Sequence, residues 1–139
     1  MTRNLCLVPT RYLGDQLEII LSDDASIITA PIDDDDSAAS KARDLIEEYF
    51  GIKFTLKAMN QFQYLGEIEH DYQTFSVIHF DMPKNHMADF AKKMSVIFDK
   101  NDKEYRCFFK SLWDERPNVG FKFNDSFNLA VALKLLSIS

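Results

Sequence analysis

Segments rich in β-branched and aromatic residues recur along most of this chain and predict a β-sheet. Two of them flank a turn at residues 12–15, which predicts a strand pair near the start. The segment 72–80 alternates imperfectly and then becomes continuously apolar, as is typical of an interior strand covered on both faces. We therefore expect a mixed sheet. Its expected strands are residues 4–10, 16–21, 52–58, 62–69 and 72–80.

Apolar positions at helical spacing predict a helix over residues 37–51. Asp36 or Ser37 is expected to cap its start, and Gly51 to end it. The same spacing predicts a second helix over residues 86–98, followed by a polar loop. The apolar face of the first helix would pack against the sheet. That face is formed by Ala38, Ala42, Leu45, Ile46 and Tyr49.

The other side of the 37–51 helix carries three carboxylates, Asp44, Glu47 and Glu48. At about 100° per residue, both glutamates lie within about 60° of Asp44, so the three can converge. Like charges at this spacing repel one another unless a cation relieves them, and oxygen ligands suit magnesium or manganese. The pattern alone also fits an ordinary solvated face on which Arg43 pairs with Glu47.

Composition and charge narrow the classes of protein that fit. The chain of 139 residues is 46% hydrophobic and 27% charged, which predicts one globular domain over residues 1–139. A net charge of -6 opposes binding to long nucleic acids. A small polyphosphate remains a possible ligand of this acidic protein. A bound metal ion and local cations such as Arg43, Arg11 or Arg106 would offset the negative charge of the phosphates. We expect no membrane-spanning or secretory segment, and a cytoplasmic protein.

Glycine and cysteine usage excludes further classes. The four glycines form no phosphate-cradling loop, which argues against P-loop triphosphatases and dinucleotide-binding folds. Cys6 and Cys107 are far apart in sequence and have apolar neighbours, so we expect buried thiols rather than a disulfide or zinc pair. No serine or cysteine is placed beside a histidine as a nucleophile would be.

The run Arg43-Asp44-Leu45-Ile46-Glu47-Glu48 resembles the centre of the Nudix hydrolase box. That box reads Gly, five residues, Glu, seven residues, then Arg-Glu-hydrophobic-any-Glu-Glu-any-Gly-hydrophobic. Further along, residues 104–115 resemble the late strand of the family, and residues 126–136 its final helix. Arg43, Leu45, Glu47 and Glu48 match the box, whereas Asp44 and Asp35 replace glutamates, and Thr29 and Phe50 stand where it has glycines.

The resemblance implies an α+β fold, a Nudix-like α/β/α sandwich with a mixed sheet packed between helices. It also implies a Mg²⁺- or Mn²⁺-dependent pyrophosphohydrolase whose substrate is a small nucleotide, a nucleoside diphosphate linked to another moiety. The metal ligands would be Asp44, Glu47, Glu48 and Glu104, with Glu47, Glu48 and Arg43 as the catalytic residues. Arg43 would orient a glutamate of the box.

Two other interpretations remain open from the sequence. The missing glycines are consistent with a catalytically inactive Nudix-like module that binds a nucleotide or a protein partner. An unrelated α+β domain would also fit, because fold analogy alone is not evidence of function. Asp35 lies in a run of four aspartates at the expected helix start, where acidic residues are common, so a solvated turn is the simpler interpretation of that run. The substrate and the oligomeric state are not encoded in any recognisable motif.

Overall fold

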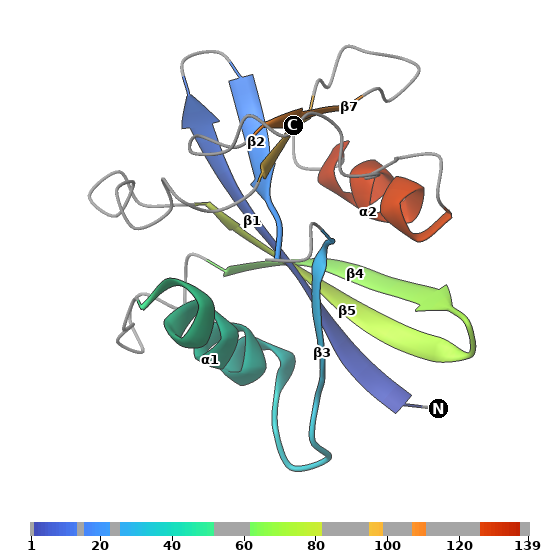
Figure 1. The fold of residues 1–139 in the computed structure, drawn as a ribbon. Coiled ribbons are helices and arrows are strands. Elements are labelled where there is room, and N and C mark those ends of the chain that lie inside the picture. The colour runs from blue at the N-terminus through green and yellow to red at the C-terminus, as the bar shows by residue number, and fades with distance from the viewer. Residues whose placement is uncertain are drawn as a thin grey trace.

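A computed structural model shows a seven-stranded sheet with one helix against each face (Figure 1). The structure describes residues 2–13, 16–22, 26–51, 62–81, 95–98, 107–110 and 126–136. In chain order the elements are β1 (Thr2–Leu13), β2 (Gln16–Ile20), β3 (Ile28–Pro31), α1 (Ala38–Phe50), β4 (Phe62–His70), β5 (Gln73–Asp81), β6 (Ser95–Phe98), β7 (Cys107–Lys110) and α2 (Ser126–Leu136). Neither α1 nor α2 has the length and apolar character needed to cross a membrane.

The long strand β1 organises the sheet because it pairs with three other strands. Its first part runs parallel to β5, with Thr2 opposite Gln73 and Thr10 opposite Asp81. It also pairs antiparallel with β3, and its last residues form the predicted hairpin with β2. The sheet order is β4-β5-β1-β2-β6-β7, with β3 on β1. Parallel and antiparallel neighbours coexist, so the predicted mixed sheet is confirmed.

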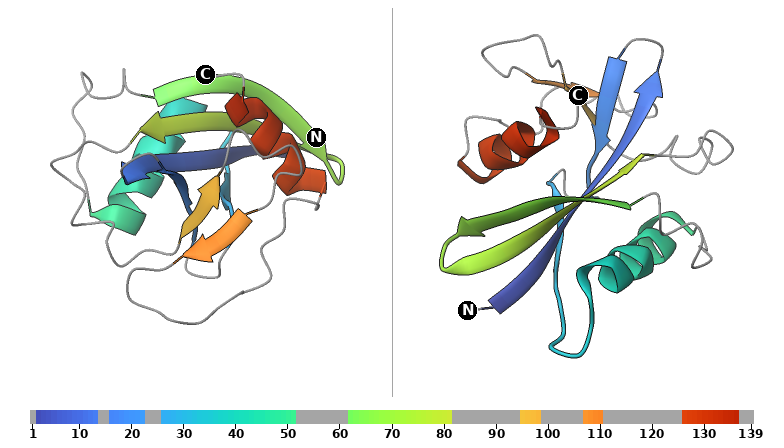
Figure 2. Two further views of the ribbon diagram at one scale, coloured as in Figure 1. Left: turned by 90° about the horizontal axis from the view of Figure 1, so that it is seen from above. Right: turned by 180° about the vertical axis from the view of Figure 1, so that it is seen from behind.

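Alternation along the strands produces two hydrophobic cores, one on each face of the sheet. In β1, Leu5 and Leu7 point towards α1, whereas Cys6 and Val8 point towards the face that α2 covers. The interior strand β5 does the same, with Ile78 in the first core and Val77 in the second. Figure 2 shows strands passing between the two helices. The α/β/α sandwich is therefore confirmed, and so is the doubly covered strand.

The first helix begins and ends where its capping residues predict. The hydroxyl of Ser37 accepts a hydrogen bond from the backbone N–H of Ser40, at 3.1 Å. At the other end Gly51 adopts a left-handed backbone with φ of 68°, and its N–H donates to the carbonyl oxygen of Glu47 at 3.0 Å. The side chains of Ala42, Leu45, Ile46 and Phe50 are buried beneath the helix.

The β4–β5 hairpin turns one residue later than the sequence suggested. Asp71 and Tyr72 form the turn with φ angles of 50° and 62°, the backbone that two-residue hairpins favour. Leu65 is an extra residue in β4, because Tyr64 faces Ile78 whereas Gly66 already faces Val77. This bulge bends β4 next to α2.

The prediction of a helix over residues 86–98 is wrong for its last four residues. Ser95–Phe98 forms strand β6, antiparallel to β2, with Val96 opposite Ile19. A short run of β-branched and aromatic residues suits either periodicity, and pairing with a neighbouring strand decides it. The remainder of that segment lies outside the described residues, as does the strand expected at 52–58. Strand β7 falls within residues 104–115, and α2 has the bounds expected from the sequence.

Cys6 is a buried thiol, and burial raises its pKa from 9.0 to about 12. We expect Cys6 to resist iodoacetamide at pH 8 in the folded protein and to react in denaturant. Between pH 9 and 12 the unfolded thiol loses its proton while the folded one retains it, so the free energy of unfolding falls as the pH rises. A Cys6→Ala variant should show a shallower fall in denaturant titrations across this range. An equal slope would contradict the assignment.

Candidate active site on helix α1

The three carboxylates of α1 lie away from its buried face. Asp44 and Glu48 are exposed, and Glu47 is half-buried, whereas Ala42 and Ile46 on the opposite side are fully buried. The helix therefore places all three acidic groups on the side that faces away from the sheet, as the sequence predicts. Their low burial leaves the three side chains accessible to a ligand.

Arg43 contacts a different carboxylate from the ones expected. Its Nη2 lies 3.4 Å from Oδ1 of Asp44, and the two side chains are 32% and 50% exposed. Among the described residues, this contact to the adjacent aspartate stands in place of the expected pairing with Glu47 or Glu48. An exposed pair with this separation contributes under about 1 kcal/mol to stability. The positive charge of Arg43 therefore partly offsets the negative charge of Asp44.

The described residues contain no group of three acidic, histidine or cysteine side chains arranged to hold a metal ion. The expected convergence of Asp44, Glu47 and Glu48 on one point is therefore absent from this arrangement. The donor chemistry nevertheless fits magnesium, which is commonly held by one or two carboxylates with water and substrate phosphate completing its shell. Glu47 and Glu48 are the residues of α1 that would supply such carboxylates.

The remaining box positions explain why the match to the family pattern is incomplete. Phe50, at a glycine position of the box, is buried in the core beneath α1, and the helix ends at Gly51 one residue later. Thr29, at the other glycine position, is an exposed residue of β3 paired with Cys6. Asp35 is an exposed residue before the helix. Glu104 and Arg106 lie outside the described residues.

Arg11 and Glu18 form a buried ion pair that is not among the expectations from the sequence. Nε of Arg11 donates to Oε2 of Glu18 at 2.7 Å, and the two side chains are 1% and 0% exposed. The sequence suggests Arg11 as a local cation for polyphosphate, and its burial contradicts that role. The hairpin register places the two residues directly opposite each other, so their symmetric spacing about residues 14–15 was the available signal.

A second polar cluster links β1 and β5. The hydroxyl of Thr10 donates to Oδ1 of Asp81 at 2.9 Å and lies 2.7 Å from Nε2 of His79. Because the hydroxyl has one proton, Nε2 of His79 must be the donor in the second contact. Alternation puts this cluster on the sheet face covered by α2, opposite α1. No local sequence signal predicts it, since Thr10 and Asp81 are separated by 71 positions.

Comparisons with known proteins identify the fold. No protein-family profile matches the chain, and no curated protein matches it in sequence. The structure is similar to the crystal structure of a MutT/nudix family protein from Enterococcus faecalis, with a TM-score of 0.54 and 10% sequence identity. The match covers 99% of this chain and 62% of that protein, so the chain spans less than two thirds of its length. At this identity the likeness concerns architecture alone, and the chain is an α+β domain with a Nudix-like fold.

Proposed function

We propose that this protein is a Mg²⁺-dependent pyrophosphohydrolase that cleaves a nucleoside diphosphate linked to another moiety. The observation that carries the proposal is the position of α1. In a chain with a Nudix-like fold, the run that resembles the Nudix box forms a helix with its acidic residues facing away from the sheet. A helix bearing adjacent accessible glutamates can hold a divalent ion beside a phosphate chain.

Each residue of α1 has a defined part in this proposal. Glu47 and Glu48 would hold the cation, and one of them would accept the proton of the attacking water. A magnesium ion in this position would neutralise phosphoryl charge and lower the pKa of a bound water. Asp44 is one methylene shorter than glutamate and lies beside Arg43, so it would act through a water molecule. Arg43 would limit the charge repulsion among the three carboxylates.

The test is a turnover assay over a panel of nucleotides. Nucleoside triphosphates, dinucleoside polyphosphates, nucleotide sugars and nicotinamide or flavin dinucleotides are incubated with the protein and magnesium or manganese. We expect at least one to be split at a diphosphate linkage, with activity lost on addition of EDTA and restored by excess magnesium. If no compound turns over with either metal, the enzymatic proposal fails.

A second candidate is a nucleotide-binding module without catalysis. It is favoured by the absence of a three-ligand metal cluster among the described residues and by the contact between Arg43 and Asp44. Calorimetry separates the two candidates, because saturable binding of a nucleotide that is recovered intact supports the module. Absence of nucleotide binding would instead favour a protein-interaction role.

A further inference from the structure

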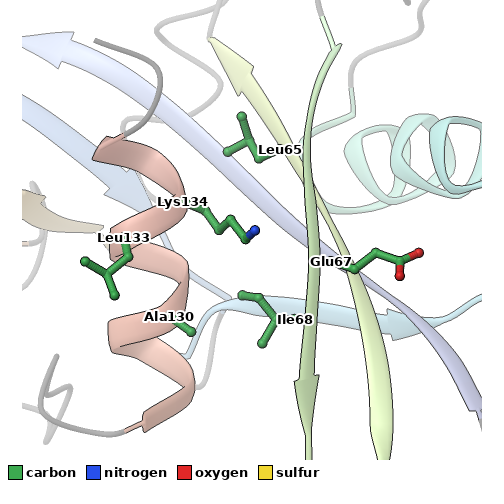
Figure 3. A pocket seen from close by; sticks show the side chains of 6 residues that line it. All are labelled: Leu65, Glu67, Ile68, Ala130, Leu133 and Lys134. Atoms are coloured by element: carbon green, nitrogen blue, oxygen red, sulfur yellow. The ribbon is translucent and has the colours of Figure 1, made fainter.

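A groove runs between α2 and strand β4, on the opposite side of the sheet from α1. It has a volume of about 480 Å³ and is lined by Leu65, Glu67, Ile68, Ala130, Leu133 and Lys134. Figure 3 shows Leu65 and Ile68 pointing towards α2, while Lys134 reaches from α2 towards β4. Leu133 is 50% exposed, which is high for a leucine on a packed helix. The groove therefore has an apolar floor formed by Leu65 and Ile68 of β4, whereas Figure 3 shows Leu133 at the rim, on the side of α2 away from β4.

Strand β4 forms the other side of the groove and is the last of the described strands on this side of the sheet. It is the outermost strand in the order β4-β5-β1, and within the described part of the chain only β5 pairs with it (Figure 2). An edge strand directs a row of backbone N–H and C=O groups outward. An extended chain is the ligand that can form hydrogen bonds with every group of such a row. The nine residues of β4 are long enough to accept an added strand.

The charged residues of β4 indicate which kind of extended chain would bind at this edge. Ile68 faces the groove, so Glu67 and Glu69 lie on the other face, where Figure 3 shows Glu67 pointing away from α2. Both glutamates are exposed. Across a strand pair, opposite charges attract and like charges repel. A strand added at this edge would therefore favour basic residues on the face of Glu67 and Glu69, and apolar residues towards the groove.

We propose that this groove and the edge of β4 bind an extended polypeptide segment in which basic and apolar residues alternate, by adding it to the sheet as a strand. A second copy of this chain is a poor occupant, because two β4 strands would bring their glutamates together at an edge of an already acidic protein. The apolar side chains of the segment would contact Leu65 and Ile68. Its basic side chains would face Glu67 and Glu69.

The bulge at Leu65 helps form this groove. Gly66 has a φ of 110°, and a Cβ atom placed on it would lie 3.0 Å from Nζ of Lys134. The glycine therefore lets the lysine ammonium lie close over the backbone of β4, on the groove side of the strand. The positive charge of Lys134 also disfavours a basic residue on the groove side of the added strand. Both faces therefore favour the same alternation, with apolar residues towards the groove and basic residues towards Glu67 and Glu69.

The test uses fluorescence anisotropy with a labelled peptide of alternating valine and lysine, about ten residues long to match β4. A second peptide has the same side chains but N-methyl groups on alternate backbone nitrogens, which removes donors and blocks strand pairing. We expect saturable one-to-one binding of the first peptide and at least roughly tenfold weaker binding of the second. Equal binding of the two peptides would overturn the proposal.

Protein variants separate specific pairing from general attraction to an acidic protein. Glu67→Lys combined with Glu69→Lys should weaken binding of the first peptide by roughly tenfold or more. The matched control is Asp33→Lys combined with Asp34→Lys, which makes the same change in net charge at exposed residues before α1 and should alter binding less than about twofold. An equal loss in the control, or dimers of the free protein that the Glu67 and Glu69 changes abolish, would show that the proposal is wrong.

Discussion

A Glu18→Gln variant is expected to lose about 3–5 kcal/mol of unfolding free energy, a large part of what a single domain possesses. The reason is that Arg11, whose side chain is 1% exposed, would keep its charge after losing the carboxylate of Glu18. Urea denaturation monitored by circular dichroism measures the loss, and a fall in Tm of roughly 10–20 °C should accompany it.

The chain offers a matched control for this prediction. Asp44→Asn makes the same carboxylate-to-amide change in the ion pair of Arg43 and Asp44, which is 32% and 50% exposed, and should cost under about 1 kcal/mol. Replacing both buried partners, with Arg11→Met and Glu18→Leu, should recover most of the stability because neither charge of this pair then remains buried. If Glu18→Gln costs no more than Asp44→Asn, the buried pair is not desolvated as described.

Glu47→Gln combined with Glu48→Gln should reduce metal-dependent turnover by at least about 100-fold, if the proposed hydrolase activity is correct. The amides keep the shape of the side chains but remove the charge that would attract the cation and the basic oxygen that would accept a proton. Both side chains lie away from the buried face of α1. The free energy of unfolding should therefore change by less than about 1 kcal/mol.

The control for the glutamate variants is Asp33→Asn combined with Asp34→Asn, which removes two charges from exposed residues near the start of the same helix. It should retain turnover within about twofold, since these residues take no part in the proposed site. Steady-state rates over a range of magnesium concentrations measure both variants. Equal rates for the glutamate variant and the wild type would place the chemistry elsewhere in the molecule.

Much of the architecture could be predicted because its signals are local. The bounds of α1 follow from Ser37 and Gly51, whose side-chain and backbone preferences act within one turn of the helix. The cover on both faces of β5 follows from its apolar run. Helical spacing predicts a helix that includes residues 95–98 because four residues do not distinguish the two periodicities, whereas pairing with β2 makes them a strand.

In the candidate site, the face of α1 that carries Asp44, Glu47 and Glu48 follows from their spacing alone, because helical geometry sets the direction of each side chain. The contacts of these and other polar groups depend instead on how the whole chain packs. This packing places Arg43 beside Asp44 and buries Arg11 with Glu18. It also joins Thr10 to His79, which is 69 positions away. Side-chain contacts across a sheet depend on strand order and register, and these result from packing the whole core rather than from any one segment.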